Sequence, residues 1–315
     1  MLNQIKIALL LLVVSFVFML SSIMQNTLIA QTRARGNYFF QQTRDNAHIQ
    51  TIVLAFPQGQ TITFKQQDGL WRIKEADDYY ADFSKINTMI KIIRDTTIYR
   101  ADKINEADAQ KIIKDALSIK SIDANGKIID EALIAPKQDI NKFYYATLNH
   151  QPLLYQLNGQ IEFSPLLMDW VHSPILALPY QQIKRIKADN FQVYRRLTGE
   201  DMLDVKTNEP VSYIKNLAQH FWYLSADDIK HALHFNRQKY DQTKSFTITS
   251  FDGSIYQITL FYNQQEYWVT VKLDREKIVS PTVIKSIKEN TMLYDGWYFK
   301  INARVGAAIA NFFLE

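Results

Sequence analysis

The sequence predicts an α+β protein in which an N-terminal transmembrane helix is followed by two tandem repeats of antiparallel β-sheet with packed helices. Three observations predict it. Residues 7–24 form an uncharged, apolar run. Most of the remaining chain consists of short apolar segments separated by turn residues, a pattern typical of antiparallel strands. The order of strand, helix and turn patterns then recurs in the second half of the chain.

The first element is the apolar run from Ile7 to Met24. An α-helix rises about 1.5 Å per residue, so this run reaches roughly 27 Å, close to the hydrocarbon thickness of a bilayer. A cleaved signal peptide is the alternative, but its apolar core is usually shorter, and no clean small-x-small site follows. We therefore expect an anchor over residues 1–30 and a linker over 31–47. Basic residues flank both ends of the run, so local charge leaves the side of the membrane open.

Composition excludes several classes of protein. The 36 basic and 32 acidic residues give a net charge of +4 with no long block of one sign, so nucleic acid is not an expected partner. A chain that is 47% hydrophobic is not disordered. The absence of cysteine excludes disulfides, zinc ribbons, thiol nucleophiles and iron–sulfur clusters.

The first α+β module is expected over residues 48–180. Residues 51–56 and 61–64 alternate as two strands around a Pro-Gln-Gly turn, and Asp68-Gly69 predicts a hairpin into a strand at 70–73. Further hairpins are expected at Asn125-Gly126 and at Asn149-His150.

Two helices are expected between these strands. The first has five apolar residues on one face, at helical spacing: Phe83, Ile86, Met89, Ile90 and Ile93. The second begins after Asn105, whose side chain can cap it, and its inward residues are Ile112, Ile113, Ala116 and Leu117.

The second module, residues 181–315, repeats this order. Five apolar residues stand 128 positions after those of the first helix: Val211, Ile214, Leu217, Ala218 and Phe221. Asp252-Gly253 corresponds to the Asn125-Gly126 turn, and Gly296-Trp297 lies near the place of Asp169-Trp170. We interpret the two modules as an internal duplication; the alternative is a chance likeness between two ordinary α+β domains.

These residues also resemble a known family. The hairpin Asp68-Gly69-Leu70-Trp71-Arg72-Ile73, the helix after Asp82 and the terminal segment Gly296 to Ile301 look like a bacterial domain-of-unknown-function family of membrane-anchored, duplicated α+β proteins. That family is similar to part of the auxiliary protein of gliding-motility-type ABC transporters. The resemblance implies an exported, membrane-tethered partner of a transport or envelope system, and it implies no catalytic residues. The Gly-Leu-x-x-Pro step expected after the second helix is missing here.

Residues with catalytic or metal-binding chemistry are scattered. His231 and His234 have i,i+3 spacing, and with Asp227 they are the candidates for a metal site, because histidine and carboxylate suit divalent cations. No third ligand is marked, so we predict no metal and no cofactor, and interpret these residues as exposed helix positions. Glu75, Asp77 and Asp78 are interpreted as a solvated turn. The five tryptophans are expected in the core or at the junction of the modules: Trp71, Trp170, Trp222, Trp268 and Trp297.

Two function classes stay open. The first is a non-enzymatic binding or scaffold protein, held in the inner membrane by residues 7–24 with its body in the periplasm and an integral membrane protein as partner. The second is an anchored envelope hydrolase whose site is built from scattered Asp, His and Tyr residues. A sensor is a third reading, and it would need a partner to carry the signal, because only six residues precede the span. We expect the first, as an accessory of an ABC-type transport or cell-envelope system.

Overall fold

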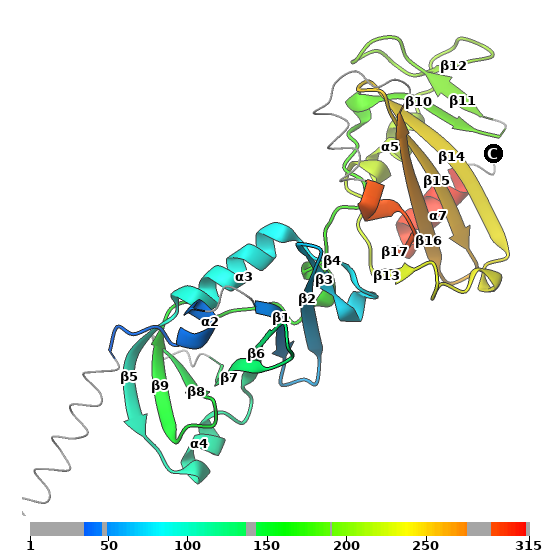
Figure 1. The fold of residues 1–315 in the computed structure, drawn as a ribbon. Coiled ribbons are helices and arrows are strands. Elements are labelled where there is room, and N and C mark those ends of the chain that lie inside the picture. The colour runs from blue at the N-terminus through cyan, green and yellow to red at the C-terminus, as the bar shows by residue number, and fades with distance from the viewer. Residues whose placement is uncertain (1–34, 46–48, 137–142, 190, 276–290, 313–315) are drawn as a thin grey trace, which may run out of the picture. The chain divides into compact units, whose positions relative to one another are not determined.

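The structure, a computed structural model, describes residues 35–45, 49–136, 143–189, 191–275 and 291–312 (Figure 1). Contacts between residues divide the chain into two compact units. Unit 1 contains the described residues up to Gly69 together with Ser84–Pro165, and unit 2 contains Leu70–Phe83 together with the described residues from Leu166 onward. The expected division at residues 180 and 181 therefore differs from the one that the contacts define.

The expected membrane span, Ile7–Met24, lies outside the described residues. Within the described ranges, no helix has the combination of length and apolar composition that crossing a bilayer requires. The fold class itself is confirmed at the coarser level, because the described chain is α+β with two antiparallel sheets and few helices.

Unit 1 is built on one antiparallel sheet. Within this unit the strand order is β2-β1-β6-β7-β8-β9-β5. The bounds of these strands are β1 (Ile49–Ala55), β2 (Thr61–Gln67), β5 (Thr97–Lys103), β6 (Leu117–Asp123), β7 (Ile128–Ile134), β8 (Tyr144–Leu148) and β9 (Leu153–Asn158). Its helices are α2 (Gln41–Asp45), α3 (Phe83–Asp95) and α4 (Glu106–Ile112).

Unit 2 contains the second sheet, with the order β12-β11-β10-β14-β15-β16-β17-β13. Its strands are β10 (Ile183–Ala188), β11 (Gln192–Tyr194), β12 (Leu203–Asp204), β13 (Asp228–His231), β14 (Gln242–Ser250), β15 (Ser254–Tyr262), β16 (Tyr267–Arg275) and β17 (Trp297–Ile301). Its helices are α5 (Ile214–Trp222) and α7 (Ala303–Phe312), with short 3-10 turns η2 (Leu167–Asp169), η3 (Tyr180–Gln182) and η4 (Arg237–Lys239). The segment from Leu70 adds β3 (Leu70–Ile73), η1 (Lys74–Ala76) and β4 (Tyr79–Tyr80).

The two sheets follow the chain in the same order. Each strand of unit 1 has a counterpart at the same position in the sheet of unit 2. The counterparts of β1, β2 and β5 are β10, β11 and β13, and those of β6 to β9 are β14 to β17, in the same order along the chain. The expected match of Gly296-Trp297 with Asp169-Trp170 is wrong: β17 takes the place of β9, whereas Asp169 ends the 3-10 turn η2.

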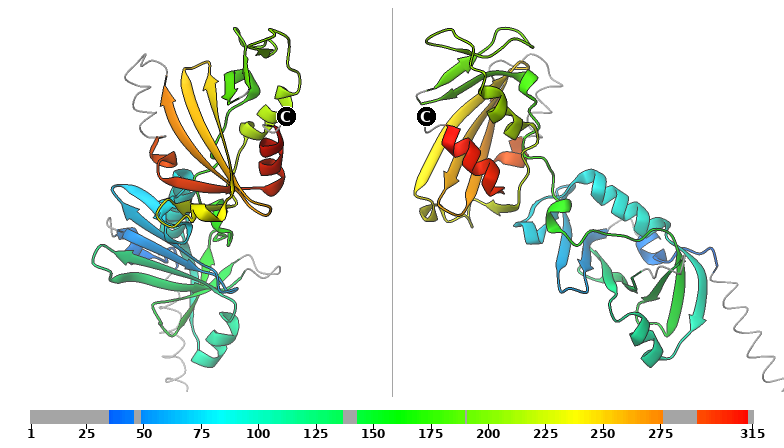
Figure 2. Two further views of the ribbon diagram at one scale, coloured as in Figure 1. Left: turned by 90° about the vertical axis from the view of Figure 1, so that its right-hand side faces the viewer. Right: turned by 180° about the vertical axis from the view of Figure 1, so that it is seen from behind.

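Helices α5 and α7 cover one face of the sheet in unit 2 (Figure 2). Helix α7 lies very close to β16 at Gly306. A Cβ atom at this position would clash with the ring of Tyr267. Glycine is therefore required there for space. Helix α5 buries Ile214, Leu217 and Phe221, as expected, but Val211 precedes the helix.

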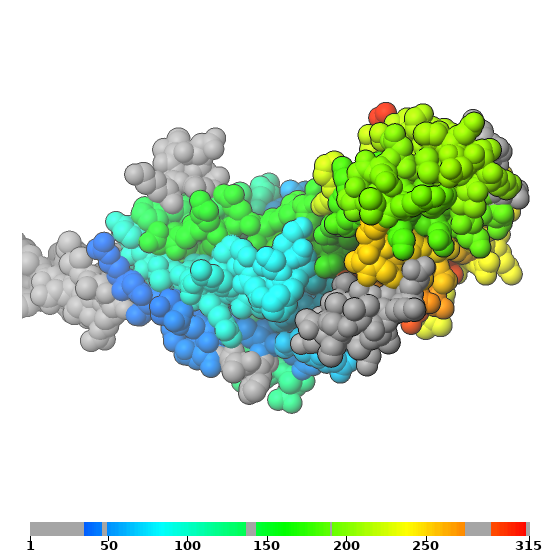
Figure 3. All heavy atoms as spheres, turned by 90° about the horizontal axis from the view of Figure 1, so that it is seen from above, coloured from blue at the N-terminus to red at the C-terminus, as the bar shows by residue number. Residues whose placement is uncertain are grey.

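Helix α3 confirms the first predicted helix, with two exceptions on its apolar face. Ile86, Met89 and Ile93 are buried, whereas Ile90 is half-buried and Phe83 is 68% exposed. Figure 3 shows α3, in cyan, at the surface of unit 1, so part of its flank faces solvent. An apolar residue at the edge of a helical stripe can therefore stay partly in water, because burial follows the tertiary contacts and not the stripe alone.

Helix α4 confirms the predicted cap and corrects the predicted length. The side chain of Asn105 accepts a hydrogen bond from the backbone N–H of Asp108 over 2.8 Å, so it satisfies one of the helix's unpaired donors. The helix ends at Ile112, and Leu117 already begins β6. The hairpin turn after β6 forms as expected: Asp123 accepts from the N–H groups of Asn125 and Lys127, and Gly126 takes a positive φ of 80°.

Candidate functional site

The three candidate metal ligands lie on strand β13 and in the segments that flank it. His231 ends strand β13 and His234 lies in the turn after it, so neither is on a helix. Asp227 is exposed, and its backbone N–H donates to the carbonyl of Lys300 over 2.7 Å. In the part of the chain that the structure describes, no group of three His, Cys, Asp or Glu side chains is placed to hold a metal ion.

Asp77 is the carboxylate that the structure places beside the two histidines. Its Oδ1 lies 2.6 Å from Nδ1 of His234, and its Oδ2 accepts from the backbone N–H of His231 over 2.7 Å. Asp77 follows η1 as its C-cap in the left-handed conformation, with φ 61°, and its side chain is 23% exposed. Asp77 lies in a turn as expected, and Glu75 and Asp78 beside it are exposed, but the carboxylate of Asp77 is partly buried in a contact that spans 157 positions of sequence.

The pair of Asp77 and His234 has the geometry of a carboxylate that orients an imidazole. Such a pair becomes catalytic when the imidazole also contacts a nucleophile or a metal. Among the described residues, the hydrogen bond of the His234 side chain goes to Asp77. The pair therefore fastens the segment Leu70–Phe83 to the rest of unit 2.

Tyr79 provides the apolar part of the same fastening. Its ring packs edge-on against Trp297 and Phe299, at centroid distances of 5.0 and 5.6 Å. Its hydroxyl donates to the carbonyl of Leu293, and burial raises the pKa of Tyr79 well above its usual value. A tyrosine held protonated in this way is a packing residue, not a base.

Four of the five tryptophans are buried as expected, and one is not. Trp71, Trp170, Trp268 and Trp297 are between 2% and 8% exposed. Trp222 is 64% exposed, so its expected place in the core or at a junction is wrong. The helix α5 already buries Leu217, Ala218 and Phe221, and Trp222 lies outside that face at the helix end.

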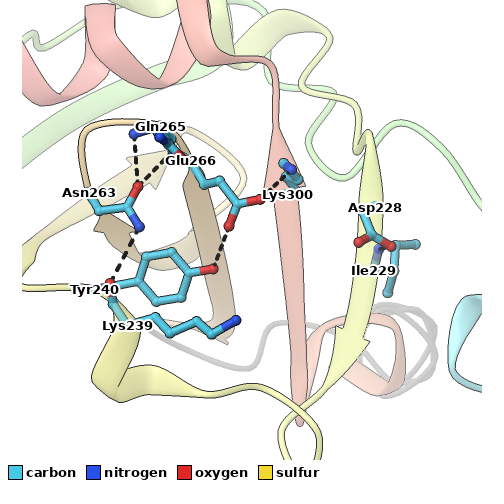
Figure 4. A network of polar contacts seen from close by, with 8 residues as sticks. All are labelled: Asp228, Ile229, Lys239, Tyr240, Asn263, Gln265, Glu266 and Lys300. Carbon is cyan, nitrogen blue, oxygen red and sulfur yellow. Dashed lines mark hydrogen bonds and ion pairs between the residues drawn. The ribbon is translucent and has the colours of Figure 1, made fainter.

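A polar network in unit 2 joins the β15–β16 turn to β17 and η4 (Figure 4). Glu266 accepts from Nζ of Lys300 over 2.6 Å and from the hydroxyl of Tyr240 over 2.9 Å. The hydrogen bond from Lys300 lowers the pKa of Glu266. Burial, followed by the bond to Glu266, raises the pKa of Tyr240 to about 12.

This network lies beside an aromatic cluster and has no base for chemistry at neutral pH. Phe235 stacks on Tyr298 at 3.8 Å and on Tyr240 at 5.1 Å, and it also contacts Trp268. A general base needs a pKa near the working pH, and the shifts of Tyr240 and Glu266 both move away from it. The network therefore acts as a structural clamp.

In unit 1 the chain that precedes β1 is docked on the sheet. The N–H of Gly36 donates to Ile98, the N–H of Ile98 donates to Asn37, and the N–H of Phe39 donates to Thr96, each over 2.8 Å. Phe39 and Phe40 are each 1% exposed. At least residues 36–43 of the expected linker 31–47 are thus part of the folded unit.

Asp130 holds the end of this docked segment. It is 1% exposed on β7, and its Oδ2 accepts from the backbone N–H of Thr43 over 2.7 Å. Its Oδ1 accepts from the side-chain amide of Asn149 over 3.2 Å, and the hydroxyl of Thr43 hydrogen-bonds that of Ser121. Asp130 shares the inward face of β7 with Ala132 and Ile134, two and four residues on, and this alternation is a signal of burial that the sequence contains.

Two cavities of similar size occur in unit 1 among the described residues. One, of about 640 Å³, lies at the β1–β2 turn and includes Tyr144 and Glu162. The other, of about 670 Å³, lies beside the docked segment and carries polar side chains from α2, β5, β7 and the β8–β9 turn. Its lining residues are Asn37, Tyr38, Phe39, Gln41, Gln42, Ile98, Ala101, Lys103, Asp130, Leu148, Asn149, Gln151, Leu153 and Tyr155. We name it the amide cavity, because five of these residues are Asn or Gln, and it is the candidate binding site of this molecule.

Comparison with known proteins adds no relative. No protein-family model matches the chain, no curated protein matches it, and no solved structure matches it. The resemblance to membrane-anchored auxiliary proteins stays a prediction from the sequence.

Proposed function

We propose that this protein is a non-enzymatic binding scaffold, anchored in the inner membrane by residues 7–24 with its body in the periplasm. Its partner is an integral membrane protein, and its role is that of an accessory to an ABC-type transport or cell-envelope system. The observation that supports it best is the docking of residues 36–43 on unit 1.

This docking limits how far unit 1 can lie from the membrane. Residues 25–35 separate the expected span from Gly36, the first of the described residues that is hydrogen-bonded to the sheet. An extended chain covers at most about 3.6 Å per residue, so this connection spans at most about 40 Å. A body held within that distance meets a membrane partner at a high effective concentration, so the binding interface does not need high affinity by itself.

The common strand order of the two sheets supports an internal duplication. Residues that recur at corresponding places are core, turn and capping residues, such as Asn125-Gly126 and Asp252-Gly253 between equivalent strands. Repetition of packing residues without repetition of the charged residues favours a duplicated scaffold over a duplicated active site.

Affinity capture from membranes tests the scaffold role. We expect the full-length protein to recover integral membrane subunits of a transporter, identified by mass spectrometry, and the body without residues 1–30 to recover them poorly. A full-length variant with a long Gly/Ser insertion after Thr32 should recover an intermediate amount, because a longer tether lowers the effective concentration. Equal recovery by all three proteins would contradict the proposal.

Two further measurements separate the alternatives. Alkaline phosphatase fused after Arg35 should be active, and activity there of a reporter that works only in the cytoplasm would contradict the periplasmic location. Hydrolysis of a substrate by the purified protein would favour the hydrolase if His234→Asn abolished it while the fold persisted.

A further inference from the structure

The amide cavity of unit 1 has the size of a small-ligand site and is open to solvent on one side. Its volume is about 670 Å³, within the range of roughly 300–1,000 Å³ that is typical of such pockets. The docked segment that contains α2 lines the cavity together with residues of β5, β7, β9 and the β8–β9 turn. The cavity therefore exists only when the segment after the expected span is docked.

The polar groups of the cavity are mostly carboxamides. Gln41 and Gln42 come from α2, and Asn149 and Gln151 come from the β8–β9 turn. Each carboxamide has an acceptor oxygen and a nitrogen with two donor hydrogens. Such side chains suit a ligand whose own groups both donate and accept hydrogen bonds.

Two of these amides are held in place by buried partners. The side chain of Asn149 donates to Asp130 over 3.2 Å and accepts from the backbone N–H of Glu131 over 2.8 Å. The side-chain Oε1 of Gln151 accepts from the hydroxyl of Tyr155 over 2.8 Å. Side chains fixed in this way lose little rotamer freedom on binding, so they favour specific recognition.

Charge and the sheet edge disfavour two other ligand classes. Lys103 and Asp130 are the charged residues of the lining, and Asp130 is buried with both oxygens hydrogen-bonded, so a phosphate or a carboxylate would meet one lysine and no paired cations. An extended peptide binds by adding a strand to an open sheet edge. Here the backbone groups of Ile98 on β5 and of Thr96, the residue before the strand, already hydrogen-bond to the docked segment. Their partners are Gly36, Asn37 and Phe39.

We propose that the amide cavity binds a neutral saccharide of one or two rings. The hydroxyls of a sugar donate and accept as carboxamides do, and the apolar lining residues, such as Leu148 and Leu153, can pack against its less polar face. This site goes beyond the proposed scaffold role and does not depend on it, because a membrane partner can be captured whether or not a sugar binds.

Saccharide titration of the full-length protein in lipid nanodiscs tests the proposal; nanodiscs are needed because detergents with sugar head groups would compete. The probes are maltose, cellobiose and N,N′-diacetylchitobiose, and the measurements are saturation-transfer NMR and calorimetry. We expect at least one to bind with a Kd of about 1 mM or tighter. Gln151→Ala should weaken that binding about tenfold, the effect of losing one well-placed hydrogen bond.

Gln58→Ala is the matched control, because Gln58 is an exposed glutamine that lines the other cavity of the same unit. It should leave saccharide binding unchanged, and Gln41→Ala should weaken it, since Gln41 lines the amide cavity from a separate element. Failure of all three probes to bind, or equal losses for Gln151→Ala and Gln58→Ala, would overturn the proposal. Tighter binding of glucose 6-phosphate than of every neutral sugar would also overturn it.

Discussion

The two units share a strand order, but the chain segment that enters each sheet is held by a buried side chain of opposite charge. In unit 1, buried Asp130 accepts from the backbone N–H of Thr43, which precedes β1. In unit 2, buried Arg195 donates from its Nε to the carbonyl of Ile183 and from a terminal nitrogen to that of Tyr180, at the start of β10. Both side chains are 1% exposed. The two units therefore share their topology, whereas the buried charged side chain that hydrogen-bonds the entering segment differs between them.

The difference has a physical basis. The segment that enters unit 1 presents a backbone donor to the interior, so a carboxylate satisfies it. The segment that enters unit 2 presents carbonyls, and a guanidinium has five donors in a planar fork that can reach several of them. Burial lowers the pKa of Arg195, but an arginine side chain stays charged at neutral pH.

The largest expected effect tests whether the units unfold separately. Ile86→Asp in unit 1 and Leu217→Asp in unit 2 each place an unpaired carboxylate at a position that is 0% or 2% exposed. The cost is several kcal/mol, against a typical total stability of about 5–15 kcal/mol. Hydrogen exchange followed by mass spectrometry should show loss of protection in the mutated unit alone.

Ile90→Asp should cost less than Ile86→Asp, because Ile90 is half-buried, and Lys91→Asp on the exposed face of the same helix is the control. If Ile86→Asp also removed protection from β14 to β16, the two units would be one cooperative structure.

The next effect concerns the buried cation of unit 2. Arg195→Met should destabilise unit 2 by about 3–5 kcal/mol, because the carbonyls of Tyr180, Ile183 and Glu200 each lose a donor. Chemical denaturation monitored by tryptophan fluorescence checks this value. Arg196→Met is the matched control, since Arg196 is exposed, and it should change stability little. Equal losses in both variants would show that Arg195 has no special role.

The buried anion of unit 1 gives a related prediction. Asp130→Ala should cost about 3 kcal/mol, because the N–H of Thr43 and the amide of Asn149 both lose their acceptor. Asp130→Asn keeps an acceptor for one of them and should cost less. Proteolysis near residues 36–45 should become faster in the alanine variant. An unchanged rate there would contradict the assignment of Asp130 to the docked segment.

A smaller effect appears at alkaline pH in both units. Burial, together with a hydrogen bond to Glu162, raises the pKa of Tyr144 to about 12. In unit 2, burial and the hydrogen bond to Glu266 raise the pKa of Tyr240 to about 12 as well. The folded state therefore holds a proton that the unfolded state releases near pH 10. The resulting stability is complete below about pH 10 and is lost as pH rises through about 12.

Tyr144→Phe and Tyr240→Phe should each reduce the fall in unfolding free energy over this range, measured by urea denaturation at several pH values. Variants whose alkaline loss equals that of the wild type would contradict the raised pKa values.

The smallest effect concerns Lys300, which joins the tyrosine–glutamate pair in unit 2. Lys300→Met should cost at most about 1 kcal/mol at neutral pH, because both charged groups are about one-third exposed. The pKa of Glu266 is lowered, so this stabilisation is present above its usual value and is lost as pH falls below that value. Wild type and variant should converge once the pH has fallen through the lowered pKa of Glu266, and Lys272→Met, at an exposed site, should show no such pH dependence.

Local patterns of sequence predicted many elements of this fold. The Asn105 cap and the Asn125-Gly126 turn depend on neighbours within a few residues, so the sequence contains the whole cause. Prediction failed where a partner lies far along the chain. His231 and His234 have helical spacing, yet β13 forms because its backbone pairs with β17. Trp222 is apolar, yet the packing of α5 leaves it in solvent.

By itself, the sequence determined the α+β class, the alternation of strands and turns, and the apolar run that predicts a membrane anchor. Only the tertiary structure decided that Asp77 meets His234, that Asp130 binds the chain before β1, and that carboxamides from α2 and the β8–β9 turn line one cavity. The physical reason is the range of the forces involved. Propensity, capping and turn geometry act between neighbouring residues, whereas burial of a charge or assembly of a cavity depends on which distant segments the fold brings together.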